Sequence, residues 1–151
     1  MQQNLELLGP LSYTPEEISF GKTIQEQTGK PQVGFDSQIL PLKETAENPG
    51  GGSTDVGDVS WIVPNINLRV TVAPKDTPWH SWAVVACGGM SIGHKGMIYA
   101  SKAMAMTMLD LFEDPKLVEK VKAEFKERKG DEVYKANIPD GPAPTPENIG
   151  K

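Results

Sequence analysis

The segment Ile98–Phe112 constrains the fold more than any other part of the chain. The charged residues within and next to this segment fall on one narrow stripe of a helix: Lys95, Lys102, Asp110 and Glu113. Apolar residues fill most of the remaining circumference: Met97, Ala100, Ala103, Met104, Met108, Leu111 and Phe112. A helix this apolar is normally almost enclosed by other elements. We therefore expect it to lie on a sheet beside another helix, with its methionines filling the core.

Strict alternation of apolar and polar residues from Asn65 to Ala73 predicts a β-strand. One face carries Ile66, Leu68, Val70 and Val72, and the other carries Asn67, Arg69 and Thr71. Such a strand packs on one side and stays polar on the other. The short apolar run Trp82–Cys87 fits either a buried strand or one helical turn, and we expect the extended form.

Local signals predict further helices. Residues 1–8 fit the end of a helix that Gly9-Pro10 breaks. Thr14-Pro15-Glu16-Glu17 predicts a capped start for a second helix, which ends at Gly29. An amphipathic helix is predicted from Pro115 to Lys129, ended by Gly130. Residues 30–52 show no period and form a long connection, and the proline-rich residues 137–151 are predicted to be an extended or disordered tail.

His80 is the strongest candidate site residue. It stands between Trp79 and Trp82, after the predicted strand, where a neutral imidazole can be offered to a metal ion. A hydrogen-bonded surface or core histidine is the commoner outcome of such a pattern. His94, in Gly93-His94-Lys95-Gly96 at the head of the long helix, is a second candidate, because glycines allow close backbone approach and a helix amino end attracts carboxylates.

A second polar cluster follows the glycines at positions 50–52. Ser53, Thr54 and Asp55 precede Val56, and Asp58 lies one turn later. Ser, Thr and Asp are good helix N-caps, and the same side chains can bind substrate or fix a loop. Capping and a site role are compatible here, and the residues alone do not separate them.

These motifs together resemble the carboxy-terminal part of the zinc-dependent amidohydrolases of the aminoacylase and carboxypeptidase type. The resemblance rests on the runs Gly52–Trp61, Pro78–Trp82 and Gly93–Met97 and extends from about Met1 to Phe112. It implies an α/β fold in which residues 1–136 form the carboxy-terminal portion of a three-layer α/β/α catalytic domain. It also implies hydrolysis of the amide bond of aminobenzoyl-glutamate or a related N-acyl amino acid.

By this resemblance, His80 is a ligand to one of two zinc ions. The residues Ser53, Thr54, Asp55, Trp79, Trp82 and His94 are then expected to contact the small-molecule amide substrate. The remaining metal ligands and the general base of the family lie upstream of the matched stretch, and this chain has only two histidines. We expect the isolated chain to be inactive without a missing amino-terminal half or partner subunit. The alternative is a non-catalytic binding or assembly module. A third hypothesis, a piece of a longer enzyme, predicts a homo-oligomer that forms through the surface that the missing half would cover.

Composition narrows the remaining function classes. A net charge of −5 argues against nucleic acid or an anionic membrane as a partner, because both require a basic surface. The single cysteine, Cys87, excludes an internal disulfide and is predicted to be a small buried hydrophobe. The first residues lack the pattern of a signal peptide, and no stretch has the length of a membrane span, so a cytoplasmic location is the prediction.

Overall fold

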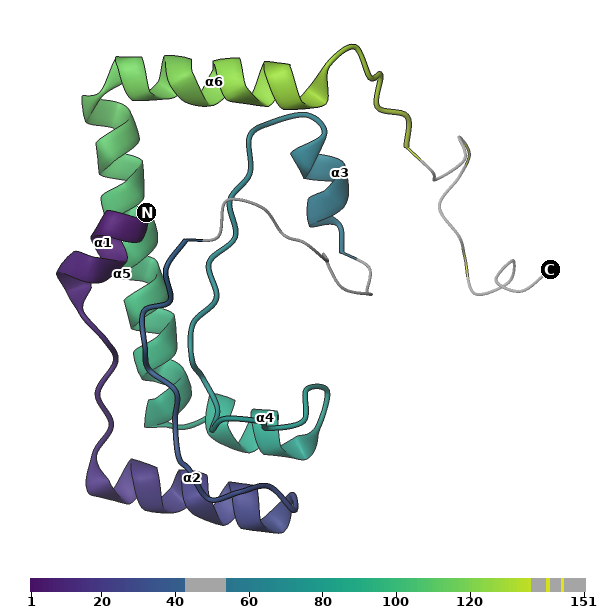
Figure 1. Cartoon of the computed structure of the whole chain (residues 1–151). Coiled ribbons are helices and arrows are strands. Elements are labelled where there is room, and N and C mark those ends of the chain that lie inside the picture. The colour runs from purple at the N-terminus through teal and green to yellow at the C-terminus, as the bar shows by residue number, and fades with distance from the viewer. Residues whose placement is uncertain (43–53, 137–140, 142–144, 146–151) are drawn as a thin grey trace. The chain divides into compact units, whose positions relative to one another are not determined.

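The computed structural model describes residues 1–42, 54–136, 141 and 145, and these ranges contain six helices (Figure 1). The helices are α1 (Gln2–Leu8), α2 (Pro15–Gln27), α3 (Val56–Ser60), α4 (Trp82–Gly88), α5 (Ser91–Glu113) and α6 (Pro115–Lys129). The chain divides into two compact units: Met1–Pro49 with Ile66–Val118, and Gly50–Asn65 with Glu119–Lys151. The predicted tail, 137–151, lies almost entirely outside the described residues.

The helix boundaries that follow from local signals are confirmed. Thr14 and Glu17 form the predicted capping box at the start of α2, with Pro15 in its first turn. Gly29 and Gly130 end α2 and α6 with φ angles of 65° and 59°, a conformation that glycine adopts without steric cost. Each of these signals acts within a few residues, so these helix ends form without a contact to a distant part of the chain.

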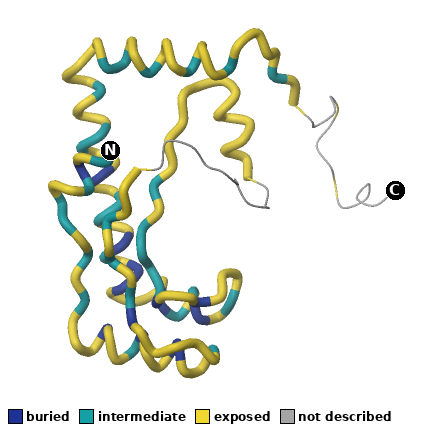
Figure 2. Tube along the Cα trace, viewed as in Figure 1, coloured by how far each residue is buried: buried dark blue, intermediate teal, exposed yellow. Residues whose placement is uncertain are grey.

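The prediction of a three-layer α/β/α domain is wrong, because the described residues contain helices and no strand. Residues 65–73 lie beside no strand with which they could pair, and a strand needs a neighbour to satisfy its backbone N–H and C=O groups. The alternation appears in the burial pattern only from Asn67 to Val70, since Ile66 is 63% exposed and Thr71 is half-buried like Val72. The segment between α3 and α4 instead changes from exposed to half-buried along its length (Figure 2).

The extended form predicted for Trp82–Cys87 is also wrong. This run is helix α4, which begins after Ser81 in an extended conformation. Ala83 and Cys87 are both 0% exposed. Residues four apart share one face of a helix, so this spacing buries both side chains at once. The prediction that Cys87 is a buried hydrophobe is confirmed, and burial raises the pKa of its thiol.

The first unit is built around the amino-terminal half of α5, on which α4 packs, while α1 packs farther along the same helix (Figure 1). Its buried cluster consists of Ile24, Ala83, Cys87 and Ile92. Half-buried side chains pack around that cluster: Tyr13, Phe20, Phe35, Ala73 and Ala86. This core holds the first turns of α5 against α2 and α4, and it therefore fixes the region that contains His80 and His94.

Buried polar groups connect the remaining segments to this core. The side chain of Gln25 is fully buried and accepts from the Gly34 N–H at 2.8 Å, while its amide nitrogen donates to the carbonyls of Gly34 and Lys75 at 3.2 and 3.0 Å. The buried Asn4 of α1 donates to Asp110 of α5 at 2.7 Å. Because buried polar groups are costly when unpaired, these bonds fix how the connecting segments pass over the helices.

The prediction that α5 is almost enclosed is wrong. Its packed face buries Ile92, Gly93, Gly96 and Ala103, but its other face is open to solvent. Phe112, for example, is 78% exposed. The sheet expected beneath this face is not formed by the described residues, so nothing in them covers it.

Candidate functional site

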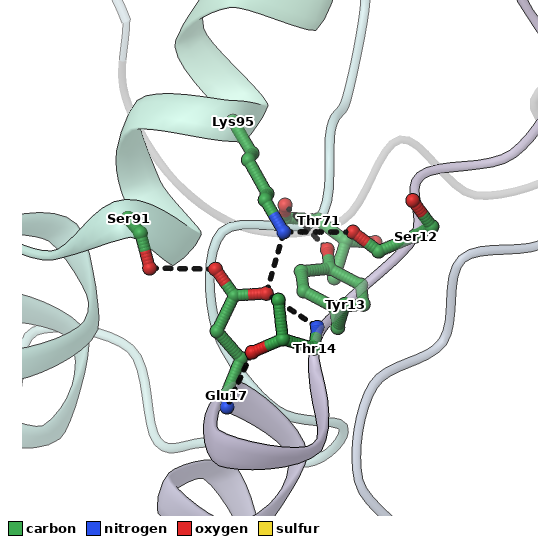
Figure 3. A network of polar contacts seen from close by, with 7 residues as sticks. All are labelled: Ser12, Tyr13, Thr14, Glu17, Thr71, Ser91 and Lys95. Carbon is green, nitrogen blue, oxygen red and sulfur yellow. Dashed lines mark hydrogen bonds and ion pairs between the residues drawn. The ribbon is translucent and has the colours of Figure 1, made fainter.

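A buried carboxylate joins the amino ends of α2 and α5. The Glu17 side chain is only 8% exposed, and its Oε2 lies 2.6 Å from Nζ of Lys95 (Figure 3). The Ser91 hydroxyl donates to the other oxygen, Oε1, at 2.6 Å. The backbone N–H of Thr14 donates to Oε2 at 2.8 Å, which completes the capping box. Both carboxylate oxygens are therefore hydrogen-bonded.

These contacts keep Glu17 ionised. The hydrogen bond from Lys95, followed by that from Ser91, lowers the pKa of Glu17 to about 2. A carboxylate that accepts several bonds, one of them from an ammonium group, is stabilised in its charged form. Glu17 is thus a poor proton acceptor near neutral pH, and its role is to position the start of α5.

Tyr13 extends the network toward the neighbouring segments. Nζ of Lys95 lies 5.8 Å from the centroid of the Tyr13 ring and donates to the Ser12 carbonyl at 3.1 Å. The Tyr13 ring stacks on Phe35 with centroids 4.0 Å apart, and its hydroxyl donates to the Thr71 carbonyl at 3.2 Å. Burial, followed by the charge of Glu17, raises the pKa of Tyr13 to about 12.

The glycines beside His94 are required by close backbone packing. A Cβ atom on Gly93 would lie 2.3 Å from the carbonyl oxygen of Gly88, and one on Gly96 would lie 2.6 Å from a methyl group of Val72. These distances are far below van der Waals contact. The prediction that the glycines of this motif allow close approach is confirmed. The backbone at His94 is thereby fixed from both sides, while the residue itself is exposed.

The structure places His80 in the turn that precedes α4. His80 has a φ angle of 59°, in the left-handed region that residues with a side chain rarely adopt. The adjacent Ser81 hydroxyl donates to the Pro78 carbonyl and closes the turn. His80 is exposed, as are Trp79 at 68% and Trp82 at 58%. The three predicted site residues of this loop are therefore accessible to a ligand.

The other predicted site residues belong to the second compact unit or lie outside the described residues. Ser53 is not among the described residues. Thr54 and Asp55 are exposed at the start of α3, where the Val56 N–H donates to the Thr54 hydroxyl at 3.3 Å. Asp55 occupies the N-cap position, but its side chain makes no capping hydrogen bond within the described part of the chain.

Asp58 pairs with a residue far along the chain. Its carboxylate accepts a hydrogen bond from the hydroxyl of Tyr134, whose ring also stacks on Trp61 with centroids 6.4 Å apart. This hydrogen bond is the main reason that the pKa of Tyr134 is raised. Asp58 therefore ties α3 to the segment that follows α6 within the second unit.

The described residues do not make a complete metal site. Among them, no group of three or more His, Cys, Asp or Glu side chains is placed to hold a metal ion. A catalytic zinc ion normally takes three protein ligands and a water molecule. His80 offers at most one of these ligands. The donor set in the described ranges therefore does not fit a zinc ion by itself.

Sequence reasoning identified the motif around His94 but missed the network beside it. The capping box pointed to Glu17, yet the same carboxylate also binds Ser91 and Lys95, more than 70 residues away. Lys95 lies within the motif Gly93-His94-Lys95-Gly96, but a lysine next to a histidine gives no sign of its partner. An open hollow lined by Phe35, Asp36 and neighbouring residues includes none of the predicted site residues.

The part of the chain that the structure describes includes no helix with the length and apolar character that crossing a membrane demands.

Comparison with known proteins identifies similar hydrolases. The chain is 30% identical to one subunit of the p-aminobenzoyl-glutamate hydrolase of Escherichia coli over 97% of its own length, which corresponds to 35% of that protein. It is 35% identical to the mouse Xaa-Arg dipeptidase over 52% of the chain, and 28% identical to the human Xaa-Arg dipeptidase over 77%. The chain spans about a third of the hydrolase subunit and less of the dipeptidases. No protein-family model matches the chain, and no solved structure matches it significantly.

Proposed function

We propose, given the homology of this chain to the p-aminobenzoyl-glutamate hydrolase subunit and to the Xaa-Arg dipeptidases, that it forms one part of the active site of a metal-dependent amidohydrolase. The reaction is hydrolysis of the amide bond of aminobenzoyl-glutamate or a related N-acyl amino acid. The observation that carries the proposal is the alignment of 97% of the chain with only 35% of the hydrolase subunit. The part of the hydrolase subunit that has no counterpart in this chain, called the second segment below, would then supply the metal ligands and the general base that this chain lacks.

In this proposal His80 contributes one metal ligand, and zinc is the metal. Two features of its loop support the assignment. The imidazole is exposed. The turn that carries it is closed by the hydrogen bond from the Ser81 hydroxyl to the Pro78 carbonyl, which fixes the backbone next to His80. The other ligands and the general base come from the second segment.

The substrate contacts are proposed for the residues around this loop. Trp79 and Trp82 offer exposed aromatic surface next to His80, which suits an aromatic acyl group. His94 stands near the amino end of α5, where the helix dipole favours a carboxylate. Ser53, Thr54 and Asp55 are proposed to border the substrate. The ion pair between Glu17 and Lys95 positions the first turns of α5 without touching the substrate.

The chain alone is expected to be inactive, because one histidine cannot complete a catalytic metal site. The test uses zinc and p-aminobenzoyl-glutamate, with release of p-aminobenzoate as the readout. The chain is assayed alone and together with the portion of the E. coli hydrolase subunit that has no counterpart in it. Activity is expected only in the mixture, and His80→Ala is expected to abolish it. Arg128→Ala, a change on the exposed face of α6, serves as the matched control.

Two results would reject the shared site. The first is hydrolysis by the chain alone that His80→Ala removes, because a complete site would then assemble from this sequence. The second is a mixture that forms a complex in sedimentation but releases no product. That second result would favour the alternative, a non-catalytic assembly module, which the exposed face of α5 also supports.

A further inference from the structure

Helix α3 has little of its own to hold it in place. It spans only Val56–Ser60, no residue in it is buried, and its N-cap side chain makes no capping hydrogen bond (Figure 2). Isolated helices of this length are unstable in water, because few hydrogen bonds offset the loss of backbone entropy. Contacts to another part of the chain must therefore fix its position.

Tyr134 makes such contacts. Its hydroxyl donates to the carboxylate of Asp58 in α3. Its ring stacks on Trp61, which directly follows α3, with centroids 6.4 Å apart and planes inclined by 17°. Among the described residues, these are the only hydrogen bond and the only ring contact that join residues 54–63 to a distant part of the chain. All three residues belong to the second compact unit.

The burial of Tyr134 differs from that of its neighbours. Tyr134 is half-buried, whereas the other residues of the segment 131–136 are exposed. A hydrogen bond from a hydroxyl to a carboxylate is stronger than one between neutral groups, and the stacked indole adds apolar contact. This segment, which we call the Tyr134 strap, is thus attached to α3 through the Tyr134 side chain.

The turn before α3 is bonded to the same helix. The Asp58 N–H donates to the Asp55 carbonyl at 3.2 Å. The Val56 N–H donates to the Thr54 hydroxyl at 3.3 Å. Asp58 therefore connects Tyr134 on one side with the turn on the other, and a displacement of α3 displaces Thr54 and Asp55 with it.

We propose that Tyr134 is a positioning residue of the proposed active site, which holds α3 and thereby the turn that carries Thr54 and Asp55. The inference rests on the proposed function, which assigns Thr54 and Asp55 to the border of the substrate. Tyr134 itself touches neither the substrate nor the metal and acts through Asp58. A loosened turn weakens substrate binding without altering the metal ligands, so the effect falls on KM and not on kcat.

Hydrogen exchange of the full chain, followed by mass spectrometry, tests the contact without an assay of activity. Tyr134→Ala removes both the hydrogen bond and the stacked ring. Exchange in residues 54–63 is therefore expected to become roughly fivefold faster or more, the order of effect of one lost hydrogen bond. Val133→Ala, at a neighbouring side chain that is 88% exposed, is the matched control and is expected to leave this exchange unchanged. Unchanged exchange in Tyr134→Ala would overturn the proposal.

Variants of Asp58 show whether the hydrogen bond carries the effect. Asp58→Asn keeps an oxygen that accepts from the Tyr134 hydroxyl and is expected to retain slow exchange in residues 54–63, whereas Asp58→Ala is expected to lose it. Adding Tyr134→Phe, which keeps the ring, to Asp58→Ala is expected to have no further effect, because both changes remove the same bond. Equally fast exchange in Asp58→Asn and Asp58→Ala would contradict the role of this bond.

The kinetic test uses the mixture of the chain and the second segment, with zinc and p-aminobenzoyl-glutamate. Tyr134→Ala is expected to raise KM by about fivefold and to keep kcat within about twofold of the native mixture, whereas Val133→Ala changes neither constant. A lower kcat at an unchanged KM, or no change in either constant, would overturn the link to substrate binding. An inactive native mixture would reject that link together with the proposed function, while hydrogen exchange would still decide whether Tyr134 holds α3.

Discussion

Lys95 and Glu17 form an ion pair of 2.6 Å between residues 78 positions apart in the chain. Glu17 also caps α2, so one carboxylate both starts that helix and holds the first turns of α5. The exposed His94 is the neighbour of Lys95, and its backbone is fixed by this arrangement. The stability of this part of the first unit therefore depends on side chains from two distant segments.

Replacing Lys95 by methionine is expected to lower the free energy of unfolding by about 2 kcal/mol. The variant leaves a largely buried carboxylate without its cation, but the lysine side chain is 35% exposed, which reduces the loss below that of a fully buried pair. Denaturant unfolding measures the change. Arg128→Met removes the exposed ion pair with Glu124 and is expected to cost at most about 0.5 kcal/mol. Equal losses in both variants would contradict the role of the Lys95 pair.

The free energy of unfolding is expected to decrease as the pH falls, in a window set by the pKa of Glu17. Its pKa is lowered from 4.5 to about 2 in the folded chain, so the unfolded chain takes up the proton first as the pH decreases. The stabilisation is therefore complete above pH 4.5 and is lost as the pH falls toward 2. The difference in unfolding free energy between the native chain and Glu17→Gln, measured from pH 6 to pH 2, is expected to shrink in that window. A difference that does not change with pH would disprove this linkage.

Gly93→Ala is expected to destabilise the chain strongly, by about 2 kcal/mol or more, because the new methyl group would meet the Gly88 carbonyl at 2.3 Å. Gly88→Ala is the matched control at the other side of the same contact. Nothing lies within 4 Å of a Cβ atom there, so that variant is expected to be neutral or slightly stabilising. Thermal unfolding of the two variants compares them, and the reverse order would show that α4 and α5 do not approach this closely.

His80→Gly is expected to be more stable than His80→Ala by about 1 kcal/mol. A φ angle of 59° carries a steric cost for alanine but not for glycine. Both variants lack the imidazole, so the comparison isolates the backbone from any ligand. Equal unfolding free energies would mean that this turn is not held in the left-handed conformation.

The helices with strong end signals were predictable from short stretches of sequence. The capping box of Thr14 and Glu17 and the glycines at positions 29 and 130 are local, because their hydrogen bonds and φ angles involve residues within one turn. The candidate residues His80 and His94 could also be named from their motifs. Their assignment to a metal and a substrate remains a proposal, since spacing alone reveals no co-ligands.

What these segments pack against depends on the tertiary structure. The alternation from Asn65 to Ala73 describes one face of a strand, but pairing requires a second strand, which the described residues do not supply. The run Trp82–Cys87 forms a helix, in which Ala83 and Cys87, four residues apart, lie on the same face and are buried together. The partners of Glu17 and the exposure of α5 likewise depend on contacts between residues far apart in sequence. Most helix ends could be located from the amino acids alone, because the energies of capping and of turns are local. The choice of which helix face is buried came from the folded arrangement, because burial depends on distant parts of the chain.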